Sequence, residues 1–178
     1  RTKPLGSIPF YPCPGIGRHC ILIDPFYLSW IARKYDFQTN FINLAAETNE
    51  GMPFYVKNML FRQLGMMPIS IKDANILMLG VAFKRDVDDT RHSPAIRIME
   101  LLLEDNVHKL HYNDPWVPSI QVKGKTLKSR KLTPALLESM DLVVITTDHS
   151  DYDYNMIVAH SKFVIDTRNA TKAVRGRK

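Results

Sequence analysis

Runs of apolar residues, each about as long as a strand, alternate with stretches of helical spacing in the second half of the chain. Residues 75–83, NILMLGVAF, are apolar almost without interruption, as is typical of a strand whose sheet is covered on both faces. Further strands are expected at residues 109–112, 142–146 and 163–166. Strands that alternate with helices favour an α/β fold with a doubly wound, mostly parallel sheet and right-handed crossovers.

Helices are expected between these strands. Ser93 and Pro94 predict an N-cap and a first helical position, because the serine hydroxyl can accept free backbone N–H groups and proline has no N–H to satisfy. This helix is expected to reach about residue 105. Two shorter helices are expected at residues 133–140 and 154–159, and a polar insertion precedes the first of them at residues 113–131.

The first part of the chain has a different pattern, a loop rich in proline and glycine followed by two helical stretches. Asp24 and Pro25 predict the N-cap and first position of a helix at residues 26–34. Residues 41–64 carry an apolar stripe at helical spacing, with a kink or break expected at residues 51–53. Such a helix joins two domains, packs against its copy in a dimer, or folds onto its own domain, and the pattern leaves these alternatives open.

Composition indicates an ordinary soluble globular protein, with 45% hydrophobic and 24% charged residues among 178. No apolar run approaches the length of a membrane helix, and two cysteines are too few for a disulfide framework, so we expect a cytoplasmic protein. The net charge of +6 resides partly in basic clusters at residues 123–131 and 172–178. No aromatic stacking pattern accompanies them, so we expect a solvated loop and tail that bind neither nucleic acid nor membrane.

Ligands of doubly wound sheets bind at the carboxyl ends of the strands, where this chain has polar segments. After the first strand, Lys84 offers a point charge and Arg91 a bidentate fork to phosphate oxygens, although neither a GxGxxG nor a Walker A pattern is present. The alternative is a self-neutralising surface loop. Arg168, after the last strand, is expected at the same edge, where a charged strand end facing water is the alternative.

Cys20 follows a loop with glycines at positions 15 and 17 and precedes the helix expected after Asp24. The positive end of that helix would favour a thiolate, and the glycines allow close approach of a substrate, so Cys20 is a candidate nucleophile. The alternative is a small buried apolar residue. No second cluster with zinc-like spacing exists, so we expect no metal site. Consecutive residues such as Asp148, His149 and Ser150 cannot form a hydrolytic relay.

Several motifs resemble one known family, the UDP-glucose/GDP-mannose dehydrogenases. The stretch PCPGIGRHCILIDPFYL resembles the catalytic-cysteine loop of these enzymes, particularly of the branch that oxidises UDP-N-acetylhexosamines. LGVAFKRDVDDTRHSPA resembles the opening of their UDP-binding domain, and LVVITTDHSDYDY and VIDTRNAT resemble its closing strands. The resemblance implies the end of a helical central, dimerising domain over residues 1–70, with a Rossmann-like UDP-binding domain over residues 71–178.

The resemblance also implies an activity, the oxidation of a UDP-sugar at C6 to the uronic acid with two NAD molecules as hydride acceptors. Cys20 would attack the intermediate aldehyde and form a thioester, and Asp24 would assist water or proton movement. The sugar nucleotide would contact residues from both domains and Arg91 would approach the NAD phosphates. The implied substrate-binding residues are Tyr11, Gly15, Ile16, Gly17, Phe83, Lys84 and, as a weaker candidate, Arg168.

Departures from the family pattern leave alternatives. Family members usually have glycine where Cys13 and Arg18 stand and proline where Leu22 stands. The resemblance places the NAD-binding domain upstream of these residues, so we expect the chain alone to be inactive and the protein to form a homodimer through the central helix. A non-catalytic nucleotide-binding or dimerisation module with a drifted cysteine loop is the alternative, and gluco, manno and galacto substrates all fit.

Overall fold

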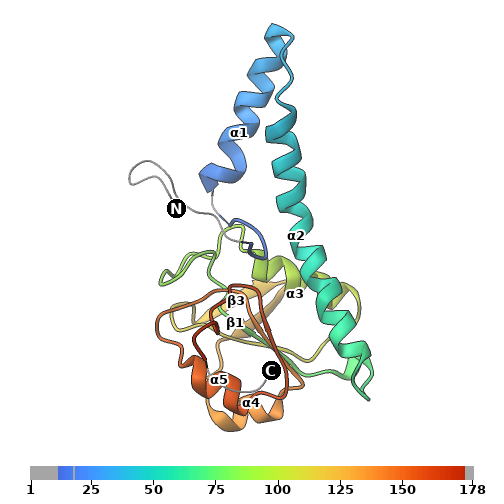
Figure 1. Cartoon of the computed structure of the whole chain (residues 1–178), viewed down its shortest axis with the longest axis vertical. Coiled ribbons are helices and arrows are strands. Elements are labelled where there is room, and N and C mark those ends of the chain that lie inside the picture. Colours follow the sequence, from blue (N-terminus) through green and yellow to red (C-terminus); the bar gives the residue numbers. More distant parts are fainter. Residues whose placement is uncertain (1–11, 18, 175–178) are drawn as a thin grey trace.

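The chain forms an α/β domain from which a pair of helices projects, as Figure 1 shows. This computed structural model describes residues 12–17 and 19–174, and the backbone alone at residues 19–22. The predictions for Tyr11 and Arg18, and for the side chain of Cys20, therefore lie outside the described part. Among the described residues, no helix is both long and apolar enough to cross a membrane.

The projecting pair consists of α1 (His19–Ala32), a short 3-10 helix η1 (Arg33–Tyr35) and α2 (Asn40–Gly65). We call α1 with η1 the first arm and α2 the second. The first arm ends at Asp36, because its left-handed backbone (φ 54°) turns the chain. The Ser29 hydroxyl then joins the arms through Thr39 and through Asn43 Oδ1 at 3.2 Å. In Figure 1 the two helices run side by side away from the sheet.

Two predictions about proline in these helices are wrong. Pro25 lies inside α1, six residues after its start, so Asp24 is not the N-cap. Pro53 lies inside α2, which continues unbroken through residues 51–53. A proline inside a helix removes one N–H donor and crowds the carbonyl four residues earlier. No glycine or other proline precedes Pro25 within α1, and only Gly51 precedes Pro53 within α2. Accordingly, α1 starts before Pro25 and α2 continues through Pro53.

The sheet contains four parallel strands in the order β2-β1-β5-β6: β1 (Ile76–Leu79), β2 (Leu110–Asn113), β5 (Leu142–Ile145) and β6 (Val164–Asp166). The helices after η2 (Ile71–Asp73) are α3 (Pro94–Glu104), α4 (Pro134–Ser139) and α5 (Tyr154–His160). The predicted doubly wound parallel sheet is confirmed. The first strand is shorter than expected because Gly80, with φ 83°, turns the chain after Leu79.

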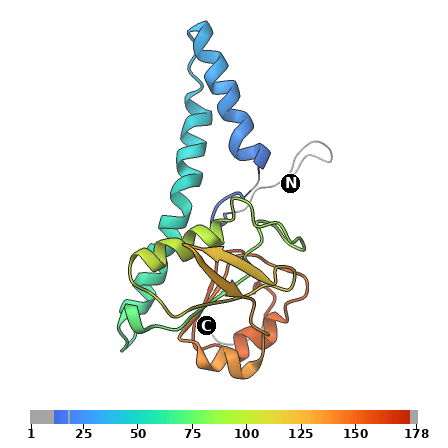
Figure 2. The same ribbon diagram turned by 180° about the vertical axis from the view of Figure 1, so that it is seen from behind.

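An antiparallel hairpin, β3 (Ser119–Val122) and β4 (Lys125–Lys128), occupies the segment predicted as a polar insertion. Figure 2 shows its two strands in gold on the face of the domain toward the viewer. Ile120 and Val122 are buried and alternate with exposed residues. Lys123 and Gly124 both have positive φ, as a tight hairpin turn requires. In the sequence, the signal for this hairpin is the alternation of apolar and polar residues beside Lys123 and Gly124.

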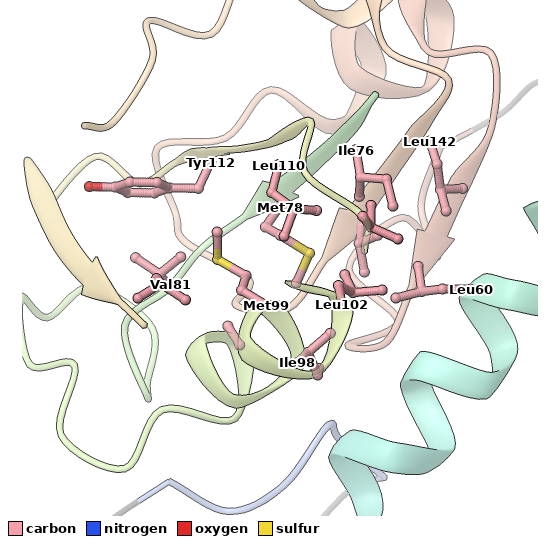
Figure 3. Packing of buried hydrophobic residues seen from close by; sticks show 14 of the residues in the cluster. Leu60, Ile76, Met78, Val81, Ile98, Met99, Leu102, Leu110, Tyr112 and Leu142 are labelled. Atoms are coloured by element: carbon pink, nitrogen blue, oxygen red, sulfur yellow. The ribbon is translucent and has the colours of Figure 1, made fainter. Parts of the chain in front are cut away.

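Apolar residues on the two faces of the sheet form two cores. Ile76 and Met78 of β1 face one cluster with α3 and the end of α2, while Leu77 and Leu79 face another with α4 and α5. Figure 3 shows the first cluster, in which Leu60 of α2 approaches the residues of α3 and the sheet. The later part of α2 thus packs on the α/β domain, while its first part projects with α1.

Candidate functional site

The loops after β1 and β5 meet in close contact at the carboxyl edge of the sheet. A Cβ atom on Gly80 would lie 2.5 Å from Thr147 Cβ and 2.7 Å from Thr147 O, so only glycine fits there. The hydroxyl of Thr147 donates to the Ala82 carbonyl at 2.6 Å. These contacts set the direction in which the loop after β1 leaves the sheet.

A buried carboxylate, Asp114 after β2, organises this edge. Its Oδ2 accepts the backbone N–H of Val81 at 2.7 Å and of Ala82 at 3.0 Å, and lies 3.0 Å from Nε2 of His149. Burial raises the pKa of Asp114, but hydrogen bonds from His149 and from three backbone N–H groups outweigh this effect, so its pKa lies below the ordinary value. Asp114 is therefore a stable anion inside the protein.

His149 is fully buried and reaches the loop after β1 with its other ring nitrogen. Nδ1 accepts the N–H of Asp86 at 3.0 Å. The carboxylate of Asp86 in turn accepts the Ser150 N–H at 2.8 Å and the Ser150 hydroxyl at 2.6 Å. His149 and Ser150 thus hydrogen-bond to Asp86 rather than to each other. This arrangement agrees with the rejection of a hydrolytic relay at residues 148–150.

Two arginines share one carboxylate at the same edge. Asp148 accepts hydrogen bonds from Arg85, which follows Lys84, and from Nε of Arg168 at 3.1 Å. Burial raises the pKa of Asp148, but the two guanidinium groups outweigh this effect and its pKa is lowered. Lys84 itself is exposed and makes no hydrogen bond or ion pair within the described part of the chain. The structure thus brings Arg168 to the loop that carries Lys84.

The glycine loop near the start of the chain packs between α2 and the α/β domain. Ile16 donates its N–H to Asn49 Oδ1 at 2.6 Å. A Cβ atom on Gly17 would lie 2.5 Å from Phe83 Cβ, and one on Gly15 would lie 3.2 Å from Pro94 Cγ. The consecutive substrate-binding candidates Gly15, Ile16 and Gly17 therefore lie close to a fourth candidate, Phe83, which is distant in the sequence.

A cleft of about 670 Å³ opens beside this loop, between α1, α2 and the start of α3. Ile23 of α1 lines it, one helical turn after Cys20, whose backbone lies in the first turn of α1. Asp24 is exposed. Ser93 also lines the cleft. It occupies the N-cap position of α3 with Pro94 next, as the sequence predicted, but its buried hydroxyl makes no capping hydrogen bond and has no partner within the described residues.

Arg91 lies on the surface and pairs with Asp89. Its Nε lies 3.0 Å from Oδ1 and its Nη2 2.7 Å from Oδ2, and the guanidinium lowers the pKa of Asp89 to about 2. For this part of the loop, the ion pair agrees with the alternative of a self-neutralising surface loop. A phosphate that binds Arg91 would share the guanidinium with Asp89. The residues that the structure describes contain no group of His, Cys, Asp and Glu side chains able to hold a metal ion.

The fold and this edge define the class of open, doubly wound α/β domains, in which ligands bind at the carboxyl ends of the strands. Residues 77–173 match the UDP-glucose/GDP-mannose dehydrogenase family, UDP binding domain, and residues 1–51 match the central domain of the same family. The chain therefore belongs to the UDP-glucose/GDP-mannose dehydrogenase family, and the predicted family resemblance is confirmed.

Relatives with known names support this assignment. The UDP-N-acetyl-D-mannosamine dehydrogenase of Methanococcus vannielii is 31% identical over 166 residues, which cover 89% of this chain and 36% of that protein. The NDP-N-acetyl-D-galactosaminuronic acid dehydrogenase of Ralstonia solanacearum is 29% identical, with 92% and 37% covered. The solved structure of a UDP-D-ManNAc dehydrogenase from Pyrococcus horikoshii superposes with a TM-score of 0.74 at 29% identity, with 95% and 38% covered.

The chain spans little more than a third of the length of these relatives, 36% of the Methanococcus protein. The fold extends to a more distant structure, a UDP-glucose dehydrogenase from Pyrobaculum islandicum, with a TM-score of 0.75 at 22% identity over 92% of this chain and 37% of that one. At that identity the likeness concerns the fold alone.

Proposed function

We propose that this chain supplies the cysteine loop and the UDP-binding domain of an NAD-dependent UDP-sugar 6-dehydrogenase that acts on a UDP-N-acetylhexosamine. The observation that carries the proposal is the contact of the Gly15–Gly17 loop with Phe83. This contact joins the sequence implied to bind the sugar to the sheet edge implied to bind UDP. Relatives named UDP-N-acetyl-D-mannosamine dehydrogenase and NDP-N-acetyl-D-galactosaminuronic acid dehydrogenase support this choice of sugar.

In the proposed reaction, two NAD molecules, bound one after the other, would each supply the acceptor for one hydride. The C6 alcohol first loses a hydride and a proton and becomes an aldehyde. The Cys20 thiolate adds to the aldehyde carbon, and loss of the second hydride converts this thiohemiacetal into a thioester. Water then adds, releases the uronic acid and restores the thiol, with Asp24 assisting the proton movement. Of the chain's own residues, Arg91 is the proposed contact to NAD.

Lys84 provides the first test, because it is exposed and unpaired within the described residues. We expect the 178-residue chain to bind UDP in a calorimetric titration, and Lys84→Met to weaken binding about tenfold, since a charged hydrogen bond to phosphate is lost. Lys125→Met on the β4 hairpin is the matched control and should bind as the unchanged chain does. Absence of heat at millimolar UDP would reject an intact nucleotide site.

Cys20 provides the second test, carried out in the protein that continues to the length of its relatives. Cys20→Ser should abolish NADH formation from a UDP-N-acetylhexosamine, because a serine hydroxyl ionises far less readily than a thiol and is the weaker nucleophile. Cys13→Ser, seven residues earlier in the loop that precedes α1, is the control and should retain activity. Unchanged NADH formation in Cys20→Ser would favour the alternative, a non-catalytic nucleotide-binding module with a drifted cysteine loop.

A further inference from the structure

Residues 83–85, which include the proposed UDP-sugar contacts, are held at their first end by one buried carboxylate. Asp114 accepts the N–H groups of Val81 and Ala82 at 2.7 and 3.0 Å. Through its other oxygen, Asp114 accepts the N–H of Trp116 at 2.9 Å. The chain that enters segment 83–85 is thereby fixed to the end of β2.

The last end of the segment is held from the loop after β5. Asp86 donates its N–H to His149 Nδ1 at 3.0 Å, and its carboxylate accepts the Ser150 hydroxyl at 2.6 Å. Asp86 has φ 58°, a left-handed conformation that aspartate adopts with strain. Two hydrogen-bonded partners therefore maintain the turn that follows segment 83–85.

His149 connects the two ends. Because Nδ1 accepts a backbone N–H, that nitrogen carries the lone pair and Nε2 carries the proton, which it donates to Asp114 at 3.0 Å. The imidazole side chain is 0% exposed and its ring packs edge-on against Tyr152 at a centroid distance of 5.6 Å. The ring therefore has a single orientation with one donor and one acceptor in use.

We propose that His149 is a positioning residue of the nucleotide-sugar site, which holds segment 83–85 in its binding conformation by accepting the Asp86 N–H while donating to Asp114. The inference rests on the proposed function, since the segment matters only where it contacts a nucleotide sugar. His149 touches no substrate in this role. It acts through the backbone that presents Phe83 and Lys84.

Two substitutions separate the two ring nitrogens. In His149→Gln an amide nitrogen can still donate to Asp114, but no acceptor faces the Asp86 N–H. In His149→Asn an amide oxygen lies near the former Nδ1 and can still accept the Asp86 N–H, while Asp114 loses the donor at Nε2 and keeps its backbone N–H partners. We expect His149→Gln to accelerate amide hydrogen exchange at Asp86 about tenfold and to weaken UDP binding about fivefold. In His149→Asn, the exchange rate at Asp86 and the affinity for UDP should stay closer to those of the unchanged chain.

Two controls accompany these variants. Tyr154→Phe removes the hydroxyl that donates to the His149 carbonyl at 2.9 Å and leaves both ring nitrogens in place. Thr133→Ala removes the side-chain cap of α4, in which Thr133 accepts the Leu136 N–H, and lowers the unfolding midpoint away from the segment. Neither control should change exchange at Asp86 or the affinity for UDP.

The outcomes are distinct. Unchanged exchange at Asp86 in His149→Gln, or equal losses in the Gln and Asn variants that follow only their unfolding midpoints, would overturn the positioning role. If the unchanged chain does not bind UDP, the proposed function fails, and exchange at Asp86 in the free chain still decides whether His149 holds the segment.

Discussion

Asp114 shows how one residue can link folding to the proposed site. Its side chain is completely buried, and it satisfies backbone N–H groups from the loops after β1 and β2 together with the His149 ring. A buried carboxylate with several donors is stable as an anion, whereas removal of its charge leaves those donors poorly paired. We therefore expect the sheet edge to depend on the ionised form of Asp114.

This dependence predicts a pH effect on stability. Because the pKa of Asp114 is lower in the folded protein than in the unfolded chain, its contribution is complete above the ordinary value of about 4 and is lost as the pH falls through the lower folded pKa. In thermal unfolding measured from about pH 7 down to about pH 2, Asp114→Asn should be less stable at neutral pH, and its stability should fall less in acid. An unchanged slope would contradict this expectation.

Gly17 predicts a second effect of a single residue. A methyl group there would lie 2.5 Å from Phe83 Cβ and 3.2 Å from the His92 carbonyl, so the loop or Phe83 must move. We expect Gly17→Ala to destabilise the fold by about 1–3 kcal/mol and to weaken binding of a UDP-sugar. Gly51→Ala in α2 meets no atom within 4 Å and should stabilise the chain by up to about 1 kcal/mol. Denaturant unfolding measures both, and equal effects would argue against the close contact.

At the scale of elements, the helical arms expose an unusual number of large apolar side chains. The exposed residues on α1, η1 and the first part of α2 are Phe26, Tyr27, Leu28, Trp30, Ile31, Tyr35, Phe41 and Leu44. Exposed apolar surfaces of this extent mark contact surfaces. They favour the homodimer expected from the sequence, because the later part of α2 packs on the α/β domain while its first part exposes Phe41 and Leu44.

Phe41 tests this surface, since its side chain is 84% exposed. In light scattering, the unchanged chain should have the mass of a dimer and Phe41→Asp that of a monomer, because a charge would be buried without a partner. Met66→Asp is the control, an equally exposed apolar residue at 81% that lies beyond the end of α2. A monomeric unchanged chain would reject the homodimer.

For the molecule as a whole, the sequence predicted the sheet well because β1 and β5 are apolar on both faces. It placed one helix start wrongly at Pro25, because α1 begins six residues earlier, at His19. The roles of Asp114 and His149 could not be predicted, because their partners come from strands distant in the sequence. Polar residues at strand ends marked the right edge without indicating which of them are buried.

The contact between the helical arms and the domain predicts a division of binding between the two parts. UDP is proposed to bind at the sheet edge and the sugar beside the Gly15–Gly17 loop, which Asn49 fixes to α2 by accepting the Ile16 N–H. Asn49→Ala should therefore leave UDP affinity within about twofold while it weakens the UDP-N-acetylhexosamine about fivefold, the effect of one hydrogen bond. Asn43→Ala, on the same helix but bonded to Ser29, should change neither value. Only the sugar is expected to reach this loop. Equal losses of affinity for UDP and for the UDP-sugar would therefore contradict the proposed division of binding.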